Sequence, residues 1–433
     1  MALSTQPYKG ARDFYPEDKR LQKYTFNTWR SVAERFGYEE YDAPILEPLE
    51  IYLAKTGDEI INEQTYVFAD RGGRKVVIRP EMTPTVSRMV AGKRQELAYP
   101  LRWYSIPNLW RYERPQRGRL REHWQLNVDI FGIASLSAEF EIIMLVSDMF
   151  KAFGATGDMY DIHLNNRELI NFILRDYLGL NETSARAVGK LLDRMHKLER
   201  TKFITLLDAI LDASKRQAGV VEKLLEILAA QRISELPDEV KQHSGARDLE
   251  DIEKRLLAAG VKNVRFDATL MRGFDYYTGI VFEVFDTDPD NNRSMLGGGR
   301  YDGLVGLFGV MPVPTVGFGW GDVTLANFLE VHHLVPLLKP EVDAYAVLVG
   351  DVLDAAQKPL AELRTAGLNV AVDFSGRKIG DQFKVAEKKG VTYAVIIGDK
   401  ELSSGRFVLK NLVTGAETAL KPSEIAKKIK NQD

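Results

Sequence analysis

The stretch Arg111-Tyr-Glu-Arg-Pro-Gln-Arg-Gly-Arg-Leu-Arg121 places five arginines among eleven residues and interrupts them with Pro115 and Gly118. Residues 101–110 before it are rich in Leu, Trp, Tyr and Ile, and residues 124–131 after it alternate apolar and polar side chains. This pattern predicts two strands that flank an arginine-rich loop. Guanidinium groups stay charged and bind phosphate oxygens in pairs, so the loop predicts a polyphosphate ligand. The alternative is a solvated charged turn.

The composition is typical of a globular protein. With 433 residues and 45% hydrophobic content, the chain is long enough for two or three domains. The absence of cysteine excludes disulfides, thiolate zinc sites and cysteine nucleophiles. The formal charge is only −3, so any nucleic-acid contact must be local. The six histidines lack metal-ligand spacing, and we expect no metal held by protein side chains.

No apolar run is long enough to span a bilayer, and the first residues lack the apolar core of a signal peptide. We therefore expect a cytoplasmic protein with no membrane partner.

The N-terminal region mixes helices with strands. The apolar spacing predicts a helix over residues 18–36, a strand over 37–46, a hairpin within 67–80 and helices over 81–92 and 138–154.

A helical segment interrupts this mixed region. Residues 171–257 are almost all helix formers, and strand patterns return at 264–270 and 279–285. A proline-flanked linker at 335–340 then leads to strands alternating with helices, which predicts a small α/β domain with a mainly parallel sheet. The expected divisions are a core over 1–170 and 261–334, a helical insertion over 171–260, and a last domain over 341–433.

A second stretch, Met271-Arg-Gly-Phe-Asp-Tyr-Tyr-Thr-Gly-Ile-Val-Phe-Glu283, precedes and enters a strongly apolar strand. If extended, Tyr276 and Tyr277 point to opposite faces, so one hydroxyl should face a polar pocket. The alternative is that both rings serve packing. P-loop and dinucleotide-binding glycine patterns are missing, and the glycines at 297–299 and 317–321 serve either ligand approach or packing.

A third group of side chains consists of hydrogen-bond acceptors. Gln125 and Asp129 lie four residues apart and share one face of a strand, and Glu81 follows Arg79-Pro80. Such a group suits a ligand with an ammonium or an imidazole N–H. The alternative is a polar stripe on a half-exposed strand.

Together these segments resemble the histidyl-tRNA synthetases, which are class II aminoacyl-tRNA synthetases. Residues 9–16 resemble the start of that family, 36–46 its motif 1, and 109–132 its motif 2. Gly297-Gly-Gly-Arg-Tyr-Asp-Gly303 with residues 316–325 resembles motif 3. Residues 272–283 resemble the histidine-specific signature, which is the most discriminating of the set.

The resemblance implies an α+β fold: an antiparallel-sheet catalytic core with a helical insertion, followed by a C-terminal α/β anticodon-binding domain. It also implies a homodimer that activates L-histidine with ATP and Mg²⁺ and transfers the histidyl group to the 3′ end of tRNA(His). No metal ligands are implied on the protein, since Mg²⁺ comes with ATP. The first step needs alignment and cations around the phosphates rather than covalent help.

The resemblance also assigns residues to roles. Arg111 and Arg272 are the expected catalytic cations at the α-phosphate. For ATP the expected contacts are Arg111, Glu113, Arg119 or Arg121, His123 and the motif 3 position of Thr324. For histidine they are Glu81, Thr83, Arg111, Gln125, Asp129, Arg272, Tyr276 and Tyr277. Arg114 and Gln116 are expected to reach the tRNA acceptor end.

Three positions depart from the family pattern. Asp129 stands where a glutamate is expected, a difference that a small shift or a water would absorb. His123 replaces an aromatic hydrocarbon and can still stack. Motif 3 usually ends Gly-x-Glu-Arg, whereas Thr324 occupies the arginine position here. Loss of one charged donor would cost about 1.5–3 kcal/mol unless another cation substitutes.

The Thr324 departure favours one alternative: a non-catalytic paralogue acting as the histidine-sensing regulatory subunit of ATP phosphoribosyltransferase. The complete arginine-rich loop, the intact 272–283 signature and the C-terminal domain favour the enzyme.

Overall fold

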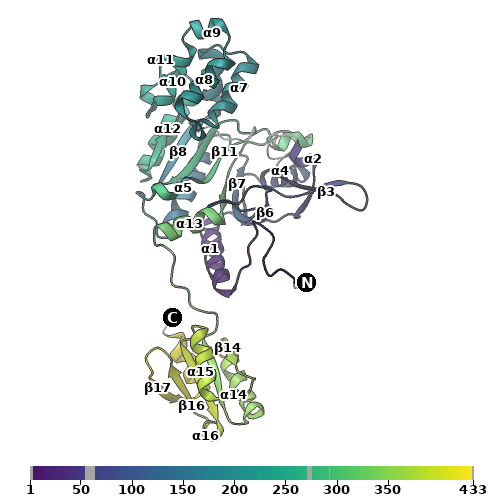
Figure 1. Ribbon diagram of the computed structural model, residues 1–433, viewed down its shortest axis with the longest axis vertical. Helices are drawn as coiled ribbons and strands as arrows, with labels where there is room; N and C mark the ends of the chain where they lie inside the picture. The colour runs from purple at the N-terminus through teal and green to yellow at the C-terminus, as the bar shows by residue number, and fades with distance from the viewer. Residues whose placement is uncertain (1–2, 54–63, 271–275, 292, 432–433) are drawn as a thin grey trace. The chain divides into compact units, whose positions relative to one another are not determined.

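The structure is a computed structural model that describes residues 3–53, 64–270, 276–291 and 293–431, without the side chain of His196 (Figure 1). The chain divides into two compact units. The first holds the chain up to Phe14 together with Gln22–Val335, and the second holds Tyr15–Leu21 and the chain from Pro336. The helix α1 (Pro16–Arg35) begins in the second unit and ends in the first.

The first unit is built on a mostly antiparallel sheet with the order β1-β5-β7-β12-β11-β10-β8-β9, to which β6 adds by pairing with β7. Its edge strands β1 and β9 pair in parallel with their neighbours, and the remaining pairs are antiparallel. The strands are β1 (Glu39–Glu40), β5 (Leu101–Ser105), β6 (Asn108–Trp110), β7 (Glu122–Phe131), β8 (Tyr160–Asn166), β9 (Val264–Phe266), β10 (Ile280–Asp286), β11 (Ser294–Arg300) and β12 (Thr315–Gly321). The predicted antiparallel core is confirmed.

The arginine-rich loop joins β6 to β7, as its flanking sequence predicts. Its base is closed by the backbone of Arg111, whose N–H donates to the Arg121 carbonyl over 2.8 Å. A bridge between Gln116 and Arg119 narrows its tip, where Gly118 takes a φ of 75° that favours glycine. The single strand expected upstream is divided into β5 and β6, because Pro107 cannot donate to a ladder.

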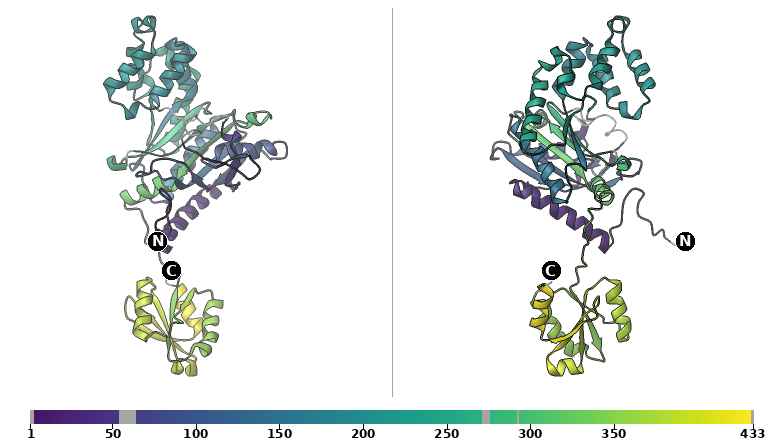
Figure 2. Two further views of the ribbon diagram at one scale, coloured as in Figure 1. Left: turned by 45° about the vertical axis from the view of Figure 1, so that its right-hand side comes forward. Right: turned by 90° about the vertical axis from the view of Figure 1, so that its left-hand side faces the viewer.

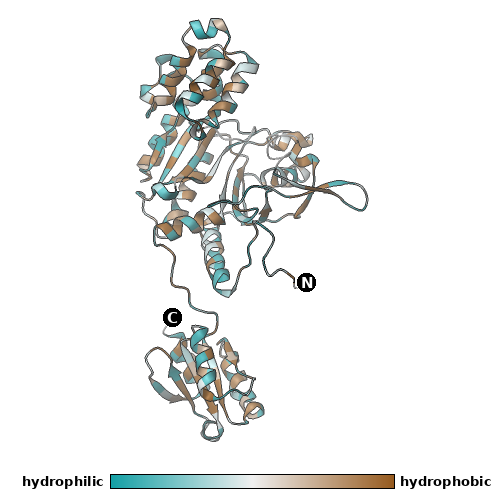
Figure 3. Cartoon of the chain, in the orientation of Figure 1, coloured by the Kyte–Doolittle hydropathy of each residue, from teal (hydrophilic) through white to brown (hydrophobic). Residues whose placement is uncertain are grey.

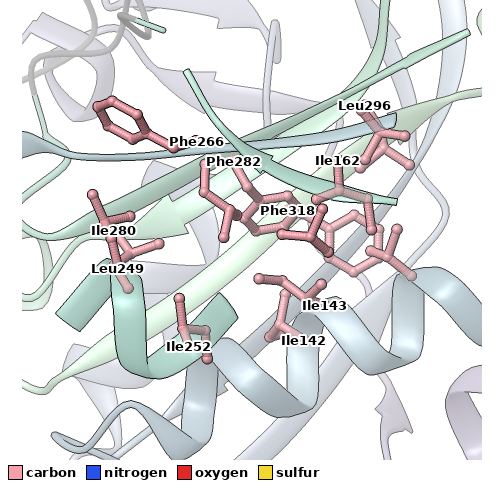
Figure 4. Close-up of a cluster of buried hydrophobic side chains, with 14 of the residues drawn as sticks. Ile142, Ile143, Ile162, Leu249, Ile252, Phe266, Ile280, Phe282, Leu296 and Phe318 are labelled. Atoms are coloured by element: carbon pink, nitrogen blue, oxygen red, sulfur yellow. The ribbon is translucent and has the colours of Figure 1, made fainter. Parts of the chain in front are cut away.

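One face of this sheet carries the hydrophobic core. The helices α5 (Ser137–Ala152) and α12 (Ser244–Ala258) cover it (Figures 1 and 2). In Figure 4, Ile142 and Ile143 of α5 lie below Phe318 and Phe282 of the sheet, with Ile252 of α12 beside them. Because side chains alternate along a strand, the opposite face is left for polar residues.

Three sequence expectations need correction. The strand over residues 37–46 forms only as β1 (Glu39–Glu40), and the chain from Leu46 enters another sheet as β2 (Leu46–Pro48). Between them Pro44 interrupts backbone pairing. The helix over 81–92 begins at Thr83 as α4 (Thr83–Gly92), and the strand over 264–270 ends at Phe266.

The predicted hairpin is confirmed as β3 (Tyr66–Ala69) and β4 (Lys75–Ile78), with Gly73 at φ 78° in its turn. The strand β4 also pairs with β2, giving a small sheet in the order β2-β4-β3. The short helix α2 (Glu50–Leu53) follows β2.

Between β8 and β9 the chain is helical, as the spacing of Leu and Ile predicts. Figure 3 shows hydrophobic and hydrophilic residues alternating around these helices, which is typical of amphipathic packing. The helices before α12 are α6 (Arg167–Phe172), a π-helical turn (Ile173–Tyr177), α7 (Glu182–Leu192), α8 (Arg200–Ile210), α9 (Ala213–Gln217), α10 (Val220–Ala229) and α11 (Asp238–Lys241).

The second unit has a five-stranded sheet in the order β14-β13-β15-β16-β17. Three strands are parallel, whereas β16 and β17 are antiparallel additions that the sequence did not predict. The elements are β13 (Ala344–Val349), α14 (Leu353–Thr365), β14 (Val370–Val372), α15 (Ile379–Lys388), β15 (Tyr393–Gly398), α16 (Asp399–Ser404), β16 (Phe407–Asn411), β17 (Glu417–Leu420) and α17 (Pro422–Lys430).

None of the helices in the described ranges has both the length and the apolar composition needed to cross a bilayer.

Candidate active site

A cavity of about 280 Å³ lies on the face of the central sheet opposite α5. The strand β7 shows the alternation that makes it: Leu126 and Val128 enter the hydrophobic core, whereas Gln125 and Asp129 line the cavity. Predicted site residues from five separate segments meet there. They are Glu81, Thr83, Arg111, Glu113, Arg119, His123, Gln125, Asp129, Tyr276, Tyr277 and Thr324.

Two glycines of β12 form part of the cavity floor. A Cβ on Gly319 would lie 1.7 Å from Gln125 Nε2, and a Cβ on Gly317 would lie 2.1 Å from Asp129 Oδ1. Both distances are far below van der Waals contact. The glycines therefore allow the amide and the carboxyl of β7 to pack across the neighbouring strand, which supports the packing reading of residues 317–321, whereas a role in ligand approach stays a prediction.

Asp129 is almost completely buried, with 4% of its surface exposed. The Tyr301 hydroxyl donates to its Oδ1. Burial raises the pKa of the Asp129 carboxyl to about 7, and the hydrogen bond from Tyr301 opposes part of this rise. Near neutral pH this side chain is therefore able to gain or release a proton.

We predict that Asp129→Asn stabilises the protein at about pH 8 but not at about pH 4. The folded protein keeps a proton on Asp129 that the unfolded chain releases above the ordinary pKa of 3.8, so stability falls as pH rises toward 7. Asparagine does not ionise and removes this loss. Thermal unfolding of both proteins across this pH range measures the effect, and an equal difference at both ends would contradict the raised pKa.

Glu81 forms the second carboxyl of the cavity and is also buried. The Tyr276 hydroxyl donates to its Oε2 over 3.3 Å, and the Tyr52 hydroxyl donates to its backbone carbonyl over 3.2 Å. The hydroxyl expected to face a polar pocket is therefore found. However, Tyr276 lies in a turn before β10, so it and Tyr277 are both buried at the cavity with ring centroids 4.8 Å apart, rather than on opposite faces.

The positively charged side chains of the cavity come from the arginine-rich loop. Arg111 donates from Nε to the Pro80 carbonyl over 2.9 Å, and Arg119 lies 3.2 Å from the Glu113 carboxylate. Burial lowers the pKa of His123 to about 3, and the positive charge of Arg111 adds to the shift. The imidazole is therefore neutral near pH 7 and offers a flat, uncharged ring beside the guanidinium groups.

Arg121, the other candidate for the outer phosphates, does not line this cavity. Its guanidinium lies 4.1 Å from the ring centroid of Tyr112 and donates to the Tyr8 hydroxyl over 2.9 Å. Its Nε donates to the Glu113 carbonyl, so Arg121 holds the base of the loop. Of the two alternatives, the geometry favours Arg119.

Arg114 and Gln116, which we predicted to contact the acceptor end of the tRNA, are exposed on the arginine-rich loop. The Arg293 guanidinium donates to Gln116 Oε1 and to the Arg117 carbonyl, each over 3.2 Å. Arg272 lies outside the described residues, so its position relative to Arg111 stays a prediction.

Thr324 lines the cavity from the first turn of α13 (Asp322–Val331). Its hydroxyl donates to the carbonyls of Met295 and Gly321, over 2.8 and 2.9 Å. The two carbonyls thus hold the hydroxyl in place, and the threonine supplies none of the positive charge that an arginine would bring to this position.

Sequence reasoning missed four polar residues of the cavity: Asn127, Glu283, Ser294 and Tyr301. Asn127 lies between Gln125 and Asp129, and the alternation of β7 gives it the same face as both. Tyr301 follows the glycines at 297–299, but nothing in the local pattern distinguishes it from a packing residue. No cluster of three metal-binding side chains occurs among the described residues.

Comparison with known proteins agrees with this geometry. Residues 10–321 match the histidyl-tRNA synthetase family. The chain belongs to that family. As an aminoacyl-tRNA synthetase it is a ligase, and its residues 340–432 match the anticodon binding domain.

The similarity of this synthetase to its relatives extends over nearly the whole chain. A histidine–tRNA ligase of Leptospira biflexa is 41% identical over 432 residues, covering 99% of this chain and 98% of its own. The crystal structure of a histidyl-tRNA synthetase from Nostoc sp. PCC 7120 has the same fold, with a TM-score of 0.81, 24% identity and complete coverage of both chains. A Bacillus halodurans protein described as an ATP phosphoribosyltransferase regulatory subunit/histidyl-tRNA synthetase has a TM-score of 0.74 and 23% identity, covering 92% of this chain and 99% of its own.

Proposed function

We propose that this synthetase activates L-histidine with ATP and transfers the histidyl group to the 3′ end of tRNA(His). One observation carries the proposal: a single cavity is lined both by the guanidinium groups of the arginine-rich loop and by two buried carboxyls. Arg111 and Arg119 suit the phosphates of ATP, and Glu81 and Asp129 suit the ammonium and imidazole of histidine.

The proposed chemistry has two steps. An oxygen of the histidine carboxylate attacks the α-phosphorus of ATP, and the bond to pyrophosphate breaks. The terminal ribose hydroxyl of the tRNA then attacks the activated carbonyl carbon, and AMP leaves. The protein contributes alignment and positive charge around the phosphates.

Mg²⁺ would accompany ATP, where it neutralises phosphate charge. The cavity fits such an ion, because the carboxylates of Glu113 and Glu283 line it and oxygen is the ligand that Mg²⁺ prefers. Arg272 remains the proposed second cation at the α-phosphate, and Thr83, Gln125 and the two tyrosines remain proposed histidine contacts.

The proposed tRNA contacts lie at two places: Arg114 and Gln116 for the acceptor end, and the C-terminal unit for the anticodon. A charging assay with labelled histidine and a tRNA(His) transcript tests this function. We expect charging that disappears when the tRNA lacks its 3′-terminal adenosine. If the protein binds histidine, does not charge the tRNA and instead alters the activity of ATP phosphoribosyltransferase, the regulatory function replaces the proposal.

We also propose a homodimer. Exposed apolar side chains share one face of the small sheet, at Leu46 of β2 and Phe68 of β3, and Ile45 precedes β2. Exposed apolar surface of this kind is typical of a protein interface. Light scattering should give the mass of two chains, and Phe68→Glu should shift it toward one.

A further inference from the structure

The tip of the arginine-rich loop is tied to the start of β11 by one side chain. The Arg293 guanidinium donates from Nη2 to the side-chain Oε1 of Gln116 over 3.2 Å. It also donates from Nη1 to the backbone carbonyl of Arg117, again over 3.2 Å. Because Arg293 directly precedes β11 and the loop joins β6 to β7, these bonds connect two segments that are far apart in the sequence.

This contact lies at the rim of the cavity. Gly118 and Arg119 of the loop line the cavity, and so does Ser294, the residue after Arg293. A Cβ on Gly118 would lie 3.9 Å from Thr324 Cγ2, which is an ordinary van der Waals contact, so the loop tip also rests on the first turn of α13. The tip is therefore held from two sides, by β11 and by α13.

The contact with Arg293 fixes the orientation of the Gln116 amide. A guanidinium group has donors only, so the atom of Gln116 that faces it must be the oxygen. The backbone of Gln116 is also engaged, because its N–H and its carbonyl both bond to Arg119, each over 2.9 Å. The amide nitrogen Nε2 donates to no group in the described part of the chain, and the residue is exposed. Gln116 thus presents its N–H donors, and not its oxygen, at the mouth of the cavity.

We propose that Arg293 is a positioning residue for the tRNA acceptor end. It holds Gln116 so that the amide N–H groups bind a hydrogen-bond acceptor of the tRNA, which is a phosphate oxygen or an acceptor atom on a base edge. An amide whose oxygen is already engaged does not pair with the edge of adenine that requires a donor and an acceptor together.

The inference rests on the proposed function, which assigns Gln116 to the acceptor end. It adds to that function the residue that orients the amide and the kind of atom that the amide recognises. The alternative is a direct contact between Arg293 and a tRNA phosphate, because Arg293 is exposed and both of its partners on the loop are uncharged. The geometry favours positioning, since both terminal nitrogens of the guanidinium bond to the loop.

The test is charging of a tRNA(His) transcript by the full chain, with the KM for tRNA measured for wild type, Gln116→Ala, Arg293→Ala and the double variant. We expect Gln116→Ala to raise this KM about tenfold, as loss of one hydrogen bond. Arg293→Ala should raise it about fivefold, because a released Gln116 must be ordered when the tRNA binds. The double variant should be no worse than Gln116→Ala alone, since Arg293 acts through Gln116.

Pyrophosphate exchange provides a second readout for Arg293→Ala. Arg119, the cation of the loop that lines the cavity, lies 3.2 Å from the Glu113 carboxylate and does not depend on Arg293 for this contact. The KM for ATP should therefore change much less than the KM for tRNA. This difference separates orientation of the acceptor end from a general disturbance of the loop.

Gln116→Glu separates the oxygen of the amide from its nitrogen. The glutamate still accepts from Arg293 but offers no donor, so we expect it to raise the KM for tRNA at least as much as Gln116→Ala. Arg30→Ala is the matched control. Arg30 belongs to α1 and also donates from Nη2 to a side-chain oxygen, that of Glu40, over 3.2 Å. Its loss should leave the KM for tRNA unchanged.

An unchanged KM for tRNA in Arg293→Ala would overturn the inference, as would an equal rise in the KM for ATP. Effects of the two alanine changes that multiply in the double variant would also overturn it, because Arg293 would then contact the tRNA itself. A wild-type KM in Gln116→Glu would contradict the assigned role of the amide nitrogen, and this variant decides if Arg293→Ala fails to fold. If the wild type charges no tRNA, the proposed function fails instead.

Discussion

Replacing Arg111 with alanine should lower the rate of histidine-dependent pyrophosphate exchange by about a thousandfold. The Arg111 guanidinium is held by the Pro80 carbonyl and lines the cavity next to neutral His123. A charge fixed in advance where the phosphates react stabilises the transition state without reorganisation, so its loss falls on the chemical step.

Arg114→Ala is the control for this change, because Arg114 belongs to the same loop but is exposed outside the cavity. It should retain exchange activity and reduce only the transfer to tRNA. Equal losses of exchange in the two variants would mean that the charge of the loop as a whole, rather than the position of Arg111, is what matters.

The largest loss of stability should come from Arg300→Ala, at about 3–5 kcal/mol of unfolding free energy. Arg300 is buried and donates twice to buried Glu139, over 2.6 and 2.7 Å. It also donates to the carbonyls of Ile133 and Ser135. Removing the guanidinium leaves the Glu139 charge buried without its partner, which costs far more than a surface ion pair.

Denaturant unfolding measures this effect, with Arg30→Ala as the control. Arg30 pairs with Glu40 at the surface, over 3.2 Å, and its loss should cost less than about 1 kcal/mol. A similar small cost for Arg300 would contradict the account of the buried pair. Tyr301 follows Arg300 directly in the chain. A substitution that weakens the Arg300–Glu139 pair without unfolding the protein should therefore also disturb the hydrogen bond that Tyr301 donates to Asp129.

The sequence predicts the site well where local periodicity decides it. Alternation along β7 places Gln125 and Asp129 on one face, and the loop between two strands follows from Pro115 and Gly118 among the arginines. These features depend on neighbours within a few residues, so one stretch of sequence contains them.

The remaining features depend on contacts between distant segments. The choice of Arg119 over Arg121 is made by Tyr8 and Tyr112, which hold Arg121 away from the cavity. The hydrogen bond between Tyr301 and Asp129 depends on three adjacent strands, because Tyr301 follows β11 and Asp129 lies on β7 across β12. The periodicity of the sequence predicts neither of these contacts, because it does not determine which strands lie next to one another in the sheet.

The central claim is that one cavity aligns ATP with histidine. Its most direct test is the exchange of labelled pyrophosphate into ATP by the purified full chain, with each standard amino acid supplied in turn. The account predicts exchange with histidine and with no other amino acid, and loss of this exchange in Arg111→Ala. Absence of exchange with histidine, or equal exchange with another amino acid, would contradict it.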